Sequence, residues 1–241
     1  MPYPKGLIVD NPSRNELLKI AEARLHPSLT EPNFLVLRSR RLQFTEWIAQ
    51  LPPNGLRVLD VGGRYQPYRP LLQDKTDIYV GLDILRTEMV DVVASGEALP
   101  FAANSFDLVI ATGVFEYFSQ PHFAAEQIRG VLRPGGSLLM SVACFAPRIV
   151  SEEKWRFTEA GLRVTFSGFS KIEIVAETYS AAGLFRSINL GLLAVSHFRL
   201  LRSLTQFSLV PALNLFGLWL EKIRFTTNDQ FAPNYSVLAV K

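Results

Sequence analysis

The segment RVLDVGGRYQP, residues 57–67, decides the fold of this chain. Its first five residues form a short apolar run, and Gly62 and Gly63 end that run. Glycine lets the backbone turn sharply and lets it approach a ligand closely. An apolar run that ends at a glycine turn is typical of the first strand of an α/β sheet, and the rest of the chain supplies the partner strands.

Further strand-like runs follow at intervals that leave room for helices. They cover residues 78–83, 91–94, 106–112, 137–145, 171–179 and 235–241. The stretch 121–132 has helical periodicity and ends at Pro134–Gly135–Gly136, a turn that cannot continue a helix. Apolar strands separated by helices indicate a mostly parallel sheet covered on both faces. The last two runs alternate more, as strands nearer an edge do.

Residues 1–53 have a helical pattern in place of strands. Ser13 and Glu16 form an S-x-x-E capping box at the start of a first helix. A second helical run begins at Phe34 and stops at Pro52–Pro53. We therefore expect an N-terminal helical cover over residues 1–53 and a sheet domain over residues 54–241.

The segment 181–225 interrupts the sheet pattern before the last strand. Its apolar residues follow helical spacing, and residues 203–220 carry no charge over 18 positions, which reaches the length threshold for a membrane span. Gln206, Pro211 and Asn214 argue against a span. We expect a helical insertion, either packed on the sheet domain or resting on a membrane as a helix pair.

Composition narrows the classes of function. With 48% hydrophobic residues among 241, the chain can bury a large core, and its single cysteine excludes a disulfide scaffold. The three histidines have no paired spacing, so we expect no dedicated metal site. The start of the sequence has no basic region leading into an apolar stretch, which predicts a cytoplasmic protein without a secretory signal.

The net charge of +3 is unevenly distributed along the chain. Lys and Arg outnumber Asp and Glu by seven to five in residues 1–50 and by six to two in 181–241, whereas residues 51–180 have twelve against fifteen. This surplus is too small for a nucleic-acid binder. A basic, apolar C-terminal part suits an anionic surface, so peripheral membrane contact through 181–225 is one expectation and a solvated basic face is the other. The oligomeric state stays open.

The polar residues that follow the apolar runs predict where a ligand binds. In an open parallel sheet, ligands bind outside the carboxyl ends of the strands. Here those positions are Asp60–Tyr65, Asp83–Ile84, Ser95–Glu97 and Thr112–Tyr117. Asp83 ends the second run, where a carboxylate can accept two hydrogen bonds from a ribose diol. The sequence therefore predicts a nucleoside site at one rim of the sheet.

Four motifs in order carry a resemblance to a known family. They are VLDVGG (58–63), YVGLD (79–83), SGEALPFAANSFDLVIATGVFEYF (95–118) and IRGVLRPGGSLLMSV (128–142). This series resembles the class I S-adenosylmethionine-dependent methyltransferases, and within them the subgroup often called type 11. The resemblance implies a Rossmann-like, seven-stranded, mostly parallel sheet whose last strand is antiparallel and inserted next to the sixth. It also implies S-adenosylmethionine as the cofactor.

The resemblance assigns roles to residues of the rim. The first loop would face the methionine part of the cofactor, Asp83 would hold the ribose, and Ile84 would lie against the adenine. Ser95 stands where the family usually has an Asp that meets the adenine amino group. The implied cofactor-binding residues are Asp60, Gly62, Gly63, Arg64, Tyr65, Asp83, Ile84, Ser95, Gly96, Glu97, Thr112, Gly113 and Val114.

The chain also departs from the family pattern. The usual first loop is D-x-G-x-G-x-G, and Arg64 and Gln66 replace two of its glycines. These changes keep a second hypothesis open, in which a degenerate domain of this fold acts as an interaction module without catalysis. A NAD-dependent oxidoreductase fits less well, because GGRYQP does not supply the G-x-G-x-x-G loop that holds a pyrophosphate.

Methyl transfer from a sulfonium mainly requires that the acceptor atom, the methyl carbon and the sulfur lie nearly in line. A general base matters chiefly when the acceptor is a hydroxyl. The candidate catalytic residues near the rim are Glu116 and Tyr117, with Arg156 as an anchor for an anionic acceptor. We expect a methyltransferase acting on a small-molecule, sugar or lipid-linked glycan acceptor. The link to glycan biosynthesis rests on the resemblance of WRFT (155–158) and of the insertion to relatives encoded with glycan assembly enzymes.

Overall fold

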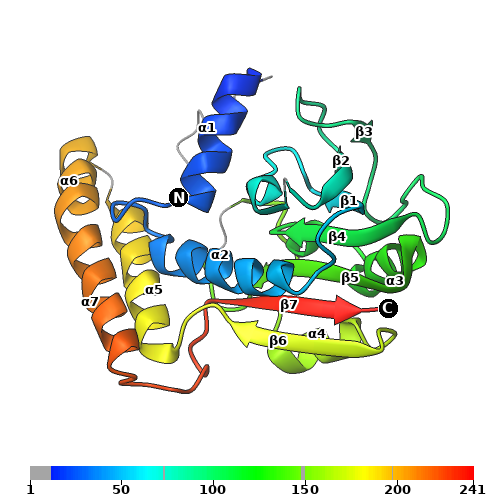
Figure 1. Ribbon diagram of the computed structural model, residues 1–241. Helices are drawn as coiled ribbons and strands as arrows, with labels where there is room; N and C mark the ends of the chain where they lie inside the picture. Colours follow the sequence, from blue (N-terminus) through cyan, green and yellow to red (C-terminus); the bar gives the residue numbers. More distant parts are fainter. Residues whose placement is uncertain (1–11, 73, 148–149, 197) are drawn as a thin grey trace.

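The computed structural model of the protein describes residues 12–241 except 73, 148–149 and 197, so His197 lies outside the described residues (Figure 1). Its described part contains a seven-stranded sheet in the order β3-β2-β1-β4-β5-β7-β6. The strands are β1 (Leu56–Val61), β2 (Thr76–Asp83), β3 (Val92–Val93), β4 (Phe106–Thr112), β5 (Leu132–Ala143), β6 (Lys171–Ala176) and β7 (Asn234–Val240). Neighbouring strands from β3 to β5 are parallel, and β7 lies antiparallel between β5 and β6. The predicted Rossmann-like sheet with its antiparallel last strand next to the sixth is therefore confirmed.

Helices cover both faces of the sheet (Figure 1). On one face lies α2 (Phe34–Ala49), which buries Phe44, Trp47 and Ile48 in a cluster with side chains of β1 and β4. The other face carries α3 (Pro121–Val131) and α4 (Glu159–Thr165). Successive side chains of a strand point to opposite faces, so the continuous apolar run of β4 supplies both clusters.

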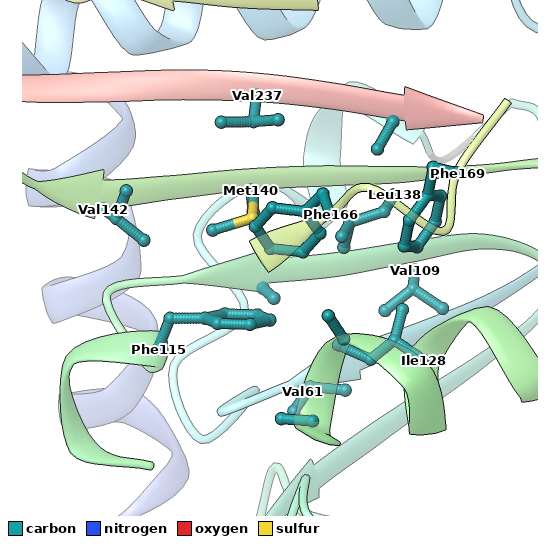
Figure 2. Close-up of a cluster of buried hydrophobic side chains, with 14 of the residues drawn as sticks. Val61, Val109, Phe115, Ile128, Leu138, Met140, Val142, Phe166, Phe169 and Val237 are labelled. Carbon is teal, nitrogen blue, oxygen red and sulfur yellow. The ribbon is translucent and has the colours of Figure 1, made fainter. Parts of the chain in front are cut away.

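Figure 2 shows the cluster on the α3 and α4 face, where side chains from β1, β4, β5 and β7 meet Ile128 of α3 and the rings of Phe115, Phe166 and Phe169. Phe115 and Phe166 are completely buried, and their ring centroids are 5.3 Å apart. Burying one such side chain stabilises the fold by about 1.5–3 kcal/mol. This core fixes the sheet beneath the turn η2 (Phe115–Tyr117), which carries two of the candidate catalytic residues.

The N-terminal helix α1 (Arg14–Leu25) begins with the predicted capping box, which is confirmed. Glu16 Oε2 accepts from the backbone N–H of Ser13 at 2.9 Å, and Ser13 Oγ accepts from the backbone N–H of Glu16. Leu17 of α1 packs against Tyr65 and Met89, so this helix covers the loop that follows β1. A domain boundary at residue 53 stays a proposal, since α2 shares a hydrophobic cluster with the sheet.

The segment before β7 is helical, as predicted. It contains α5 (Ser180–Val195), α6 (Arg199–Leu204), a π-helical turn (Thr205–Leu209) and α7 (Val210–Lys222). In Figure 1 these helices form two rods beyond the end of the sheet toward which β4 and β6 point. The first rod is α5, and the second rod consists of α6, the π turn and α7. Thr205 and Val210 are five residues apart, and the π turn places both on the buried side of the second rod.

The second rod is also the one membrane-span candidate among the described residues. The run Arg199–Lys222 is long and apolar enough to cross a membrane by length and composition. Of its most apolar stretch of 18 residues, 28% is buried inside the protein. Asn214 in this run is completely buried, and its Nδ2 donates to the backbone oxygens of Leu29 and Glu31. The side of the rod that carries Asn214 is therefore anchored to the protein.

One turn differs from its prediction. Pro134–Gly135–Gly136 lies inside the bounds of β5, because the chain turns there without leaving the sheet. The pairing of β4 with β5 shifts register between Phe106 and Leu108. Gly135 has a φ of +78°, a backbone conformation that L side chains rarely adopt. The strand therefore begins five residues earlier than the apolar pattern indicates, at Leu132.

Candidate functional site

The predicted segments converge at the carboxyl ends of the parallel strands. The backbone N–H groups of Gly62 and Gly63 donate to Leu82 O at 2.8 and 2.9 Å, which holds the first loop against the end of β2. A Cβ placed on Gly62 would lie 3.0 Å from the side chain of Val114, so this loop also touches the residues after β4. A Cβ on Gly96 would lie 2.8 Å from Val61 Cγ1, which brings in the loop after β3.

Asp83 is a partly exposed carboxylate of this rim. It is half-buried at the end of β2, and its Oδ1 accepts from the backbone N–H of Leu85 at 2.8 Å. Burial raises the pKa of Asp83, while the nearby charge of Arg64 lowers it. The next residue, Ile84, is 68% exposed. A carboxylate with remaining acceptor capacity beside an exposed apolar side chain suits the ribose and base of a nucleoside.

Asp60 lies deeper than Asp83. Its side chain is 3% exposed, and its Oδ2 accepts from the hydroxyl of Tyr79 at 2.7 Å. Burial raises the pKa of Asp60 to about 7, the hydrogen bond from Tyr79 opposes that rise, and the charge of Asp83 adds to it. Asp60 is therefore held by β2 at the start of the first loop, and its contact with the cofactor stays a prediction.

The residues that replace the family glycines have partners of their own. Arg64 donates to the hydroxyl of Tyr65, and the guanidinium groups of Arg24 and Arg64 lie 4.4 and 4.7 Å from the centre of its ring. Gln66 is buried with a φ of +51°, and its Nε2 donates to the backbone oxygen of Met89. The first loop is therefore held by α1 and by the segment after β2, in addition to the turn at Gly62.

Ser95 and Glu97 shape the loop that follows β3. Ser95 Oγ accepts from the backbone N–H of Glu97 at 3.1 Å. Glu97 Oε1 accepts from the backbone N–H groups of Ser119 and Gln120 at 3.1 and 2.8 Å, just before α3. The carboxylate of Glu97 thus satisfies backbone donors at the start of α3, a structural use that the sequence does not reveal. A cofactor contact by either residue stays a prediction.

The loop after β4 offers open space. Gly113 follows Thr112 with a φ of +60°, and no described atom beyond its two chain neighbours lies within 4 Å of the position that its Cβ would occupy. Its backbone N–H donates to Ser141 O at 2.9 Å, so the turn is fixed in place. The next residue, Val114, lies 3.0 Å from the position of a Cβ on Gly62, so the loop after β4 is next to the first loop.

The three candidate catalytic residues have different surroundings. Glu116 is 5% exposed, its Oε1 accepts from Ala143 N at 2.6 Å, and its Oε2 is buried without a partner among the described residues. Tyr117 is 38% exposed on the same turn. Arg156 donates to the backbone oxygens of three residues of its own segment, Ala146, Pro147 and Trp155, and pairs with Glu153. Arg156 thus holds the segment after β5 together, and its role as an acceptor anchor stays a prediction.

A buried network of hydrogen bonds next to this rim was not predicted from the sequence. Glu177, which follows β6, is 1% exposed and accepts from Arg40 Nε at 2.8 Å and Nη2 at 2.9 Å. The hydroxyls of Ser141 and Ser236 donate to the same carboxylate. The two serines inside otherwise apolar strands were the available signal, because a buried hydroxyl needs a partner.

A cavity of about 700 Å³ lies beside the first loop, between α1 and residues 66–70. Its wall includes Leu18, Glu22, Gln66, Arg69 and Met89. None of the predicted site residues lines it. The cavity therefore adjoins the first loop without being lined by the residues that are predicted to bind the cofactor.

The buried acid Glu116 predicts a pH effect on stability. Its pKa rises from an ordinary 4.5 to about 7, chiefly through burial. Between these two values the folded state binds the proton more tightly than the unfolded state does, so stability falls as pH rises through this window. At about 1.4 kcal/mol per pH unit, the loss by pH 8 is about 3 kcal/mol.

We expect Glu116→Gln to match the parent protein at pH 4 and to be more stable at pH 8, as measured by urea unfolding at both pH values. Asp60→Asn serves as the comparison, because Asp60 contributes a slope of the same sign. An unchanged slope in Glu116→Gln would show that this carboxylate is solvated in the folded protein.

Comparisons with known proteins agree with this geometry. A family model described as "Methyltransferase domain" matches residues 59–140. An uncharacterised methyltransferase of Mycobacterium tuberculosis is 31% identical over 109 residues, which cover 39% of this chain and 43% of that protein. The match thus spans less than half the length of this curated relative.

Solved structures share the fold over most of the chain. Phosphoethanolamine N-methyltransferase 2 of Haemonchus contortus, in complex with S-adenosyl-L-methionine, gives a TM-score of 0.52 at 16% identity over 92% of this chain and 60% of that one. The [4+2]-cyclase SpnF gives 0.50 at 20% identity over 83% and 80%. At these identities the likeness concerns the fold alone. Residues 59–140 are thus similar to a methyltransferase domain, and the strand order of the described residues agrees with the fold that the four motifs imply.

Proposed function

We propose that the protein transfers a methyl group from S-adenosylmethionine to an acceptor bound at the rim of the sheet. The convergence of Asp83, Ile84 and Gly113 at this rim carries the proposal. The residues present fit the cofactor. The half-buried carboxylate suits the ribose diol, exposed Ile84 suits the flat face of the adenine, and the open space at Gly113 suits the methionine part.

When bound, the cofactor supplies a methyl group on a sulfonium, which is already activated for displacement. The chain then has to hold both reactants in line, which can be worth about 7–11 kcal/mol in well-oriented systems. In this proposal Asp83 fixes the nucleoside end, and the loops of Gly62 and Gly113 leave room for the other end. Glu116, with a pKa of about 7 and a free carboxylate oxygen, would accept the proton of a hydroxyl acceptor.

An interaction module without catalysis is the second candidate. Two observations favour it. The charge of Arg64 lies near the carboxylate of Asp83, and the side chain of Gln66 donates to the backbone oxygen of Met89 at a position where the family usually has glycine. The fold neighbour named as a [4+2]-cyclase also illustrates that this fold alone does not fix the reaction.

Calorimetric titration with S-adenosylmethionine and S-adenosylhomocysteine tests the first proposal. We expect both ligands to bind with one site per chain. Absence of binding for both would leave only the interaction module.

For the acceptor we propose a sugar or lipid-linked molecule handled in the cytoplasm at a membrane surface, as in glycan biosynthesis. The rod made of α6, the π turn and α7 supports this proposal, because large apolar side chains on it and just before it are exposed. Phe198, Leu200 and Phe207 are 75%, 73% and 67% exposed. No Asp or Glu occurs from residue 178 to residue 220. Such a side suits the interface of a bilayer, with its apolar residues in the acyl boundary.

The charges at the two ends of this rod favour an anionic bilayer over a second copy of the chain. Arg199 lies at one end, and the exposed Lys222 and Arg224 lie at the other beside the half-buried Glu221, so both ends carry a net positive charge. In a symmetric pair of rods, parallel or antiparallel, cationic ends would meet cationic ends. Anionic lipid headgroups complement both ends at once. Since Asn214 anchors the inner side to the protein, the rod would lie on the surface rather than cross it.

Sedimentation with vesicles tests the membrane contact. We expect the protein to sediment with vesicles of anionic phospholipid at low salt, and less at high salt, since screening weakens the basic contribution. The double variant Leu200→Ser with Phe207→Ser should bind at least tenfold more weakly, because it removes two side chains that each contribute about 1.5–3 kcal/mol on burial. Val164→Ser is the matched control, as Val164 is 75% exposed on α4. Failure of the parent protein to sediment removes the membrane part of the proposal.

A further inference from the structure

Arg186 is a buried cation with only neutral partners. It is 4% exposed on α5, and its Nε and Nη2 donate to Oδ1 of Asn33 at 3.0 and 2.8 Å. Its Nη1 donates to the backbone oxygen of Phe145 at 3.4 Å, a long contact. Among the ion pairs of the described residues, none includes Arg186. Burying a charge without an opposite charge is costly, and burial lowers the pKa of Arg186 to about 10.

The neighbouring arginines are already neutralised. Arg40 is paired with Glu177, and Arg156 is paired with Glu153. Both arginines lie close enough to Arg186 to lower its pKa further, whereas Glu177 and Glu31 raise it without touching it. Arg186 therefore has no directly contacting carboxylate among the described residues; it is linked to Glu31 through Asn33, whose Nδ2 donates to Glu31 Oε1 at 3.1 Å.

The position of Arg186 places this charge on the far side of the rim from Asp83. Phe145 follows the end of β5, and α5 starts after β6, beyond the sheet end toward which β4 and β6 point in Figure 1. A row of polar side chains crosses the sheet from the loop after β4 toward this end of the rim. Thr112 pairs with Ser141 and Ser141 pairs with Ser236, and paired residues share one face of the sheet. The row ends at Glu177, the partner of Arg40.

A second unpartnered group lies on the same side of α5. Asn189 is completely buried three residues after Arg186, and residues three apart share one side of a helix. Its Nδ2 donates to Asn214 at 3.0 Å, while its Oδ1 has no partner among the described residues. Buried polar atoms are normally hydrogen-bonded, so this oxygen has unused capacity for a hydrogen-bond donor, such as a hydroxyl elsewhere on the same ligand.

We propose that Arg186 binds an anionic group of the acceptor, a phosphate or a carboxylate, at the end of the rim formed by β5 and β6. The inference rests on the proposed methyltransferase function, because it names the chemical class of the acceptor. The planar guanidinium fits two oxygens of such a group side by side. The long contact from Nη1 to Phe145 is the one most readily exchanged for an anion, and Phe145 itself is 50% exposed.

The test follows thermal unfolding while inorganic phosphate or acetate replaces chloride at constant ionic strength. We expect a saturable rise in the Tm of the parent protein, and the anion with the larger rise identifies the class. Arg186→Gln should abolish the rise. Arg163→Gln is the matched control, since Arg163 is exposed on α4, and it should keep the rise.

A charge-neutral double variant separates binding from folding. Glu31→Gln with Asn33→Asp moves one negative charge by two residues and gives Arg186 a carboxylate partner inside the protein. We expect this variant to melt at a higher temperature than the parent without added anion, and to show no further rise with it. An absent rise in the parent, or a rise that survives in both Arg186→Gln and the double variant, overturns the proposal.

Titration of every variant with S-adenosylhomocysteine distinguishes this inference from the proposed function. Loss of the anion effect with intact S-adenosylhomocysteine binding concerns Arg186 alone. If the parent protein does not bind S-adenosylhomocysteine at all, the methyltransferase proposal fails whatever the anion result is.

Discussion

Replacing Asp83 by alanine is expected to weaken S-adenosylhomocysteine binding about 100-fold. The carboxylate lies half-buried at the end of β2 and has acceptor capacity beyond its bond from Leu85. Two hydrogen bonds from a ribose diol to a charged acceptor are worth about 3 kcal/mol together at the low end of the usual range, and about 1.4 kcal/mol corresponds to a factor of ten. Calorimetric titration measures the change directly.

The control for this experiment lies on the same strand. Asp77 is exposed near the opposite end of β2, so Asp77→Ala should leave the affinity unchanged. Asp83→Asn keeps one acceptor oxygen and removes the charge, and its affinity should fall between those of the parent and Asp83→Ala. If Asp83→Ala binds as tightly as the parent, the nucleoside lies elsewhere.

Glu177→Gln is expected to lower the free energy of unfolding by about 3–5 kcal/mol, the usual result of leaving one partner of a buried ion pair unpaired. Glu177 is 1% exposed and accepts from Arg40, Ser141 and Ser236. Removing its charge leaves the buried guanidinium of Arg40 without compensation. At about 2–4 °C per kcal/mol for a chain of this size, the Tm should fall by roughly 10 °C.

A second substitution should restore much of this loss. Arg40→Met combined with Glu177→Gln removes both charges, and an uncharged core of similar volume is often as stable as a buried pair. The exposed pair of Glu159 and Arg163 provides the contrast, because its side chains are 44% and 54% exposed. Glu159→Gln should change the stability by less than about 1 kcal/mol. Equal effects of the buried and exposed variants would contradict the network.

The sheet and its rim could be predicted because their signals are local. Each apolar run marks a strand, and the polar residues after it must lie at the carboxyl end, as Asp83 and Thr112 do. The capping box of Ser13 and Glu16 is likewise confined to four residues. Short-range patterns of this kind determine local structure wherever burial does not override them.

The charged groups beside the rim could not be predicted, because their partners are distant in sequence. Arg40 and Glu177 are 137 residues apart, and Asn33 and Arg186 are 153 residues apart. No periodicity singles out Arg40 among its arginine neighbours in the run RSRR. The use of Glu97 to satisfy the backbone before α3 was missed for the same reason, since Ser119 and Gln120 come close only after folding.

The antiparallel place of β7 has a consequence for how the chain is made. Since β7 separates β5 from β6, β6 joins the sheet only when β7 arrives. During synthesis, β6 leaves the ribosome before all of α5–α7 and waits with unpaired backbone groups on both edges. Such edges invite association with other chains. Slow translation across residues 177–233 should therefore lower the yield of soluble protein, and the nascent chain would gain from a chaperone until its last strand closes the sheet.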